Sequence, residues 1–168
     1  MTIQVVFDAP LLVEATSYAG VTWLDWPAVP PVTGNHSQDA LGVIASASTY
    51  EHDWALILSP TLIKQVGDTL TQHIGLQPRD VAGFISAVGQ LAVASGGSVV
   101  SDPPSLGTGH APQVAAPLEL AHSGRRLLVT TNPALVQLGP VWGPDQQPIL
   151  CATGFVDRVD AARRVGDI

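Results

Sequence analysis

Short apolar runs alternate with longer stretches of helical periodicity along this sequence. The first run, residues 3–8, holds four apolar residues in six, three of them β-branched, and it ends in Asp8. A short run of this kind, bounded by turn residues, is typical of a buried strand. The same pattern predicts further strands over residues 54–58, 99–100, 127–130 and 149–152.

The stretches between these runs repeat apolar residues at spacings of three and four, which predicts helices. The clearest start is Ser59-Pro60, because serine caps a helix and proline suits its first position, and Gly75 suits its end. Strands that alternate with helices predict an α/β fold whose sheet is parallel and carries helices on both faces. We expect residues 1–168 to form one domain. Further helices are predicted over residues 10–19, 37–47, 80–95, 113–123, 132–138 and 155–165.

The composition narrows the class of protein. Apolar residues make up 46% of the chain and charged residues 12%, which excludes a disordered protein. The net charge is −7 with only seven Lys and Arg, so the basic stripe of a nucleic-acid-binding protein is missing and RNA is disfavoured as a partner. No apolar run reaches about 18 residues, and the N-terminus lacks the layout of a signal peptide. We therefore expect a cytoplasmic protein that does not enter a membrane.

Three further features of the chain bear on candidate chemistry. Cys151 is the single cysteine, so no internal disulfide forms, and its apolar neighbours predict a buried side chain. Residues 22–34 hold Trp23, Trp26 and several prolines, which predicts a loop whose aromatic side chains pack down as a lid. The five histidines do not show the paired spacing of a zinc site.

Four blocks, in this order, give the chain a family resemblance: VVFDAPLLVEA, LILSPTLIKQVGDTL, APLELAHSGRRLLVTTNPALVQLG and PILCATGFVDRV. The series resembles the PIN-domain family, and within it the bacterial group that includes the ribonuclease toxins of toxin–antitoxin pairs. The resemblance covers residues 3 to about 159. It implies a three-layer α/β/α fold with a central, mainly parallel sheet of four to five strands.

The family pattern places acidic residues at four positions, where clustered carboxylates hold Mg²⁺ or Mn²⁺ and the metals generate the attacking hydroxide. In this sequence Asp8 matches the first position. The second falls on Gln65, the third near Gln113 or Val114, and the fourth on Asn132. One of the four charges therefore remains.

A lone aspartate with two amides holds a divalent cation weakly, because affinity depends on the charge and number of the ligands. The resemblance thus implies a degenerate domain without catalytic residues or cofactor, in which Asp8, Gln65 and Asn132 form a remnant pocket and the two amides hydrogen-bond the carboxylate. The alternative is a Mg²⁺- or Mn²⁺-dependent endoribonuclease that keeps Asp8 as a metal ligand. Its missing acids would then be replaced by Asp68, Asp102 or Glu119, which we interpret as surface charges.

A domain of this kind that does not cut RNA is expected to bind protein, either as a homodimer or with another protein. Exposed aromatic side chains often anchor such interfaces. The candidate contact residues are Trp23, Trp26 and Trp142.

Overall fold

The computed structural model describes residues 3–18, 40, 54–107, 109–138 and 149–166. The predicted loop at 22–34, the predicted helix at 37–47 apart from Ala40, and the candidate contact residues Trp23, Trp26 and Trp142 lie outside these ranges. The strands are β1 (Ile3–Phe7), β2 (Trp54–Leu58), β3 (Ser98–Val99), β4 (Leu127–Thr130) and β5 (Ile149–Cys151). The helices are α1 (Ala9–Tyr18), α3 (Pro60–Thr69), the π-helix η2 (Leu70–Ile74), α4 (Pro78–Ala94), α5 (Pro112–Ser123), α6 (Pro133–Leu138) and α7 (Ala152–Gly166).

The five strands form one sheet in the order β3-β2-β1-β4-β5, and every pairing is parallel. The central strand β1 pairs with β2 from Ile3 opposite Trp54 and with β4 from Val5 opposite Leu127. Parallel neighbours require crossover connections, and the helices between the strands supply them. The predicted α/β fold class is therefore confirmed.

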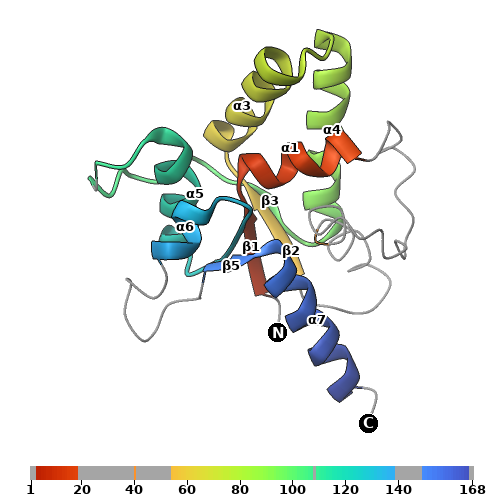
Figure 1. The fold of residues 1–168 in the computed structure, drawn as a ribbon, viewed down its shortest axis with the longest axis vertical. Coiled ribbons are helices and arrows are strands. Elements are labelled where there is room, and N and C mark those ends of the chain that lie inside the picture. The colour runs from red at the N-terminus through yellow and green to blue at the C-terminus, as the bar shows by residue number, and fades with distance from the viewer. Residues whose placement is uncertain (1–2, 19–39, 41–53, 108, 139–148, 167–168) are drawn as a thin grey trace.

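Side chains along β1 alternate between two separate cores, one on each face of the sheet. Val5 and Phe7 belong to the first core, which α1, α4 and α7 cover, whereas Val6 belongs to the second, which α5 and α6 cover. Figure 1 shows α5 and α6 on one side of the strands and α1 and α4 on the other. In the first core, Phe155 of α7 meets the rings of Phe7 and Trp54 edge-on, with centroids 5.7 and 5.2 Å apart. Helices on both faces give the three predicted layers.

The order of the strands creates a switch point beside β1. The chain passes from β1 outward through β2 to β3 and then returns to place β4 and β5 on the other side of β1. In open α/β sheets, ligands bind in the crevice at the carboxyl ends of the strands where the order reverses. Here these are the carboxyl ends of β1 and β4. Asp8 directly follows β1, and Thr130 is the last residue of β4.

The helix that follows β2 begins and ends as predicted. Ser59 has an extended backbone and its hydroxyl accepts a hydrogen bond from the Leu62 N–H at 3.3 Å, and Pro60 takes the first helical position. The last turn, Leu70–Ile74, has π-helical hydrogen bonding, and Gly75 ends it with a φ of 77°. No described helix is long and apolar enough to cross a membrane.

The predicted burial of Cys151 is wrong. Its side chain is exposed, and its Sγ accepts a hydrogen bond from the Gly154 N–H at 3.4 Å. β5 lies at one edge of the described sheet, so an apolar run there is covered less completely than the same run in a central strand. α7 begins directly after Cys151, three residues before the predicted start, which places the thiol at a helix terminus.

Candidate functional site

The candidate site is built around Asp8, which is fully buried at the carboxyl end of β1. Its Oδ1 accepts a hydrogen bond from the Leu11 N–H at 3.1 Å, in the first turn of α1. Its Oδ2 accepts one from the Thr130 hydroxyl. Because Thr130 ends β4, the carboxylate joins the two strands at the switch point.

The charge on Asp8 is costly in this position. Burial raises the pKa of its carboxyl from 3.8 to about 6, and the hydrogen bonds from Thr130, Leu11 and the Thr131 backbone offset part of that rise. A buried carboxylate without such donors would have a higher pKa still, because desolvation disfavours the charged form. The donors therefore keep Asp8 ionised at neutral pH.

Thr130 is a residue that the sequence prediction missed. It is fully buried, donates to Asp8, and its Oγ1 accepts a hydrogen bond from the Asn132 N–H at 2.8 Å. The hydroxyl thus links the carboxylate to the start of the next helix. Its place at the end of an apolar run predicted as a strand is the one signal in the sequence that points to it.

The side chain of Asn132 does not bind Asp8 in the described contacts. Its Oδ1 accepts a hydrogen bond from the Ala134 N–H at 3.0 Å and so serves the first turn of α6. Asparagine is a favoured residue before a helix for this reason. The local role of Asn132 is sufficient to account for its presence at the fourth position.

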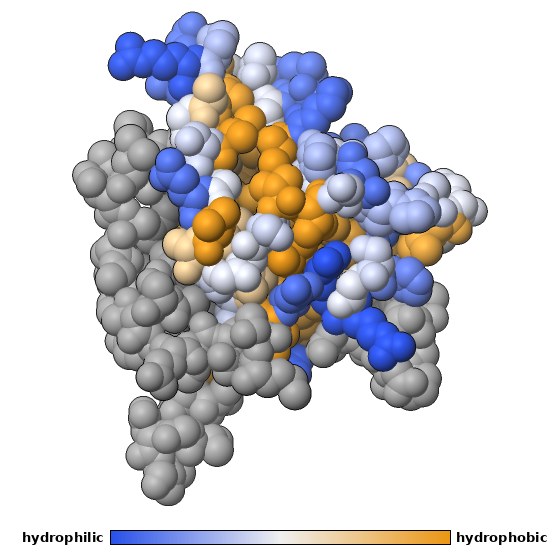
Figure 2. Space-filling view, turned by 180° about the vertical axis from the view of Figure 1, so that it is seen from behind, coloured by the Kyte–Doolittle hydropathy of each residue, from blue (hydrophilic) through white to orange (hydrophobic). Residues whose placement is uncertain are grey.

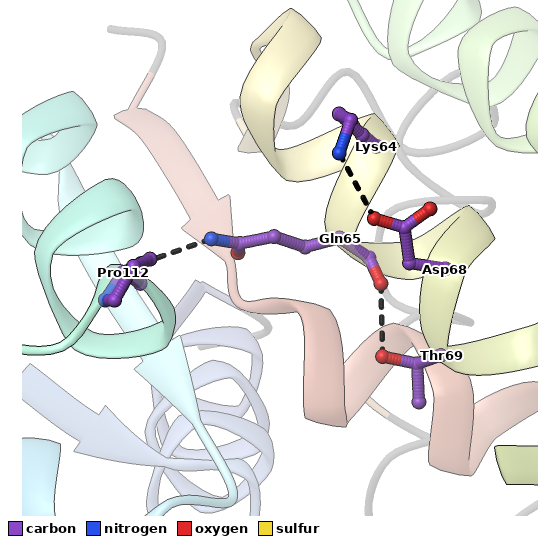
Figure 3. Close-up of polar contacts among 5 residues, drawn as sticks. All are labelled: Lys64, Gln65, Asp68, Thr69 and Pro112. Atoms are coloured by element: carbon purple, nitrogen blue, oxygen red, sulfur yellow. Dashed lines mark hydrogen bonds and ion pairs between the residues drawn. The ribbon is translucent and has the colours of Figure 1, made fainter. Parts of the chain in front are cut away.

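Gln65 extends from α3 to α5 (Figure 3). Its Nε2 donates to the Pro112 carbonyl at 2.9 Å, whereas its Oε1 is buried and has no hydrogen-bond partner among the described residues. The predicted cluster, in which both amides bond Asp8, is therefore wrong: the Gln65 amide faces the first turn of α5, and Asn132 caps α6.

The third position, Gln113 or Val114, also carries no charge, and these two residues lie in different environments. Gln113 is exposed in the first turn of α5, and Val114 packs against the second core. Gln65 reaches this same turn of α5 through Pro112, so the second and third positions are neighbours in space. The fold thus brings the second and third of the predicted positions together, and neither carries a charge.

The acids that the alternative reading requires have other partners. Asp68 forms an exposed ion pair with Lys64 at 3.1 Å (Figure 3). Asp102 accepts a hydrogen bond from the Thr61 N–H at 3.1 Å, in the first turn of α3. Glu119 accepts one from the Leu106 N–H at 3.2 Å. Asp102 therefore holds the start of α3 in place, and Glu119 holds the loop at Leu106.

These residues do not fit a Mg²⁺ or Mn²⁺ site. Mg²⁺ takes six oxygen ligands, usually one or two carboxylates together with several waters. In the part of the chain that the structure describes, no group of three or more His, Cys, Asp and Glu side chains lies close enough to hold a metal. Asp8 is the only carboxylate at the four positions, and both of its oxygens already accept hydrogen bonds.

Replacing Thr130 with valine is expected to destabilise the protein by about 2 kcal/mol at pH 7.5 without a change in side-chain shape, because the hydrogen bond to the buried Asp8 carboxylate and the one from the Asn132 N–H are both lost. The loss should shrink near pH 4, where Asp8 is protonated. Urea unfolding at the two pH values measures it. Thr69→Val is the matched control: the Thr69 hydroxyl bonds only the Gln65 carbonyl in the described contacts, and a change within about 0.5 kcal/mol is expected. Equal losses in the two variants would contradict the prediction.

Comparison with known proteins adds information on the fold alone. No protein-family profile matches the chain, and no curated protein matches it. Among solved structures, the chain is similar to the crystal structure of PAE2754 from Pyrobaculum aerophilum, with 16% identity and a TM-score of 0.52. The match covers 96% of this chain and 99% of that one. The likeness supports the three-layer α/β/α architecture over nearly the whole length.

Proposed function

We propose that this protein is a PIN-like domain of the bacterial type that has lost metal-dependent nuclease activity and acts as a protein-binding or assembly module. The observation that carries the proposal is the state of the four family positions. Only Asp8 has a carboxylate, and both oxygens of that carboxylate are occupied by the N–H of Leu11 and the hydroxyl of Thr130. The other three positions hold residues with amide or apolar side chains.

The chemistry of metal-dependent hydrolysis supports this choice. Two divalent cations near each other need several negative ligands, because the ligands must offset the repulsion between the cations and fix their geometry. A single buried carboxylate supplies neither the charge nor the number of oxygens. The net charge of −7 also disfavours RNA as a ligand, because binding to phosphates requires a positive surface.

The surface accords with binding to protein. Among the residues that the structure describes, the large apolar side chains of Ile74, Val93, Val99 and Val136 are exposed, and that of Val93 is 67% exposed. Figure 2 shows hydrophobic side chains gathered along the middle of one face, between hydrophilic ones. A homodimer or a complex with another protein would cover such surface. The single cysteine accords with a cytoplasmic location, where disulfides are rare.

Incubation with labelled single-stranded RNA and Mn²⁺ or Mg²⁺ tests the loss of activity. We expect the same background cleavage with metal and with EDTA, and no saturable Mn²⁺ binding by titration calorimetry. Metal-dependent cleavage that disappears in Asp8→Asn and persists in Asp157→Asn would refute the proposal and favour the endoribonuclease. Asp157 is a suitable control because it is an exposed carboxylate on α7 that neither hypothesis uses as a metal ligand.

Light scattering on a size-exclusion column tests the assembly. We expect a homodimer at micromolar concentration. A monomer would direct the search toward a different protein as the partner.

A further inference from the structure

We propose that Gln65 is a latch that holds the first turn of α5 against α3, and that this turn opens as a unit to give solvent access to Asp8. The latch is the hydrogen bond from Gln65 Nε2 to the Pro112 carbonyl, 2.9 Å long. The inference goes beyond the proposed function, since it concerns how the crevice is closed and holds with or without a bound partner.

The latch lies at the crevice. α3 begins at the carboxyl end of β2 and contacts α1, while α5 contacts β1, so the two helices flank the strand that ends at Asp8. In Figure 3 the Gln65 side chain crosses in front of the segment where β1 turns into α1. Crevices at this position of an α/β sheet are normally open to ligands, yet Asp8 has no exposed surface. In this proposal, the hydrogen bond between the flanking helices is the contact that closes the crevice.

The first turn of α5 can move separately from the rest of its helix. Pro117 lies inside α5, and because proline has no N–H, the Gln113 carbonyl lacks its usual helical donor. Ala111 and Pro112 are exposed on one side of this break, whereas Leu118 and Leu120 are buried on the other. The core therefore fixes the second half of α5 more firmly than the first turn, where only Val114 packs against it and is half-buried.

The latch also contributes little net free energy to the closed state. The same amide that donates through Nε2 buries its Oε1 without a partner among the described residues. An unsatisfied buried acceptor costs free energy that the single hydrogen bond must offset. Opening the turn lets water reach Oε1, which lowers the cost of opening.

The surrounding loop is held independently. Asp102 binds the Thr61 N–H at the start of α3, and Glu119 binds the Leu106 N–H from the buried half of α5. Both contacts lie outside the first turn of α5. Opening the turn therefore requires the Gln65 bond to break while these two persist.

Native-state hydrogen exchange, followed by NMR, tests the latch on the full chain. The reporters are the Ala115 N–H, which bonds the Ala111 carbonyl at 2.8 Å within the turn, and the Leu11 N–H, which bonds Asp8. Val6, fully buried in β1, reports global unfolding. In Gln65→Ala we expect both reporters to exchange about fivefold faster relative to Val6, as loss of one hydrogen bond predicts. Gln72→Ala, an exposed glutamine on η2, should leave both ratios unchanged.

Gln65→Asn, which keeps the amide but is one methylene too short to reach α5, should give the same acceleration and guards against a general packing defect in the alanine variant. Unchanged ratios in both Gln65 variants would overturn the proposal. A faster Ala115 with an unchanged Leu11 would also overturn it, because the turn would then open without uncovering Asp8. Equally faster exchange of both reporters in Gln72→Ala would also overturn the proposal.

Discussion

Replacing Gly97 with alanine is expected to destabilise the protein by about 3 kcal/mol or more. A Cβ at this position would lie 1.9 Å from the carbonyl oxygen of Leu56 and 2.7 Å from its carbonyl carbon. Both are backbone atoms of the buried strand β2, which cannot rotate out of the way as a side chain can. Gly97 is also fixed in place, because its N–H donates to the Ala92 carbonyl at 2.9 Å.

The same neighbourhood explains why the backbones approach so closely. Ser95 accepts a hydrogen bond from the Leu56 N–H at 2.9 Å and donates to the Ala92 carbonyl at 2.7 Å. Its side chain thus pairs with β2 just before β3 begins opposite Ile57. The chain must pass directly over Leu56 on its way from α4 to β3, and only glycine leaves room for that path.

Urea unfolding compares Gly97→Ala with Gly83→Ala. Gly83 lies inside α4, and a Cβ there would meet nothing within 4 Å. Alanine at position 83 should stabilise the protein by about 0.5–1 kcal/mol, because glycine is a poor helix residue. A Gly97→Ala protein whose stability matched the wild type would show that the segment between α4 and β3 lies farther from β2 than these distances indicate.

Local patterns in the sequence were sufficient to predict most elements of the fold. Residues 54–58 form a strand because the run is apolar and ends at a strong helix start, Ser59-Pro60. In α4 the buried side chains Val81, Phe84, Val88 and Ala92 follow the spacing that predicted the helix. The order β3-β2-β1-β4-β5 and the place of Gly97 depend on contacts between distant parts of the chain, which periodicity does not encode.

The candidate site was predicted in position but not in its contacts. The end of the first strand located Asp8 correctly, because a carboxylate after a buried run falls at the carboxyl edge of the sheet. The partner of Gln65 is Pro112, 47 residues away, and its choice depends on where the helices lie. Asn132 serves its own helix start, a local role that competes with any role toward Asp8.

The stability of the protein is expected to fall by about 3 kcal/mol between pH 4 and pH 7 on account of Asp8 alone. The pKa of this carboxyl is about 6 in the folded protein against an ordinary value of 3.8. Between these values the folded state binds more protons than the unfolded state, so the free energy of unfolding decreases as pH rises. The contribution is complete below pH 4 and is lost once the pH has passed the folded pKa.

Asp8→Asn tests this dependence, because asparagine keeps the shape and an acceptor for the Leu11 N–H but does not titrate. The free energy of unfolding is measured in urea at several pH values from 4 to 7.5 for the wild type and the variant. The difference between the two curves should shift by about 3 kcal/mol across this range, in favour of the variant at high pH. Asp68→Asn is the control for the removal of one carboxylate at an exposed position, since 52% of the Asp68 side-chain surface is accessible. Parallel curves for the wild type and Asp8→Asn would mean that water reaches the carboxyl in the folded protein, and burial would then not control its charge.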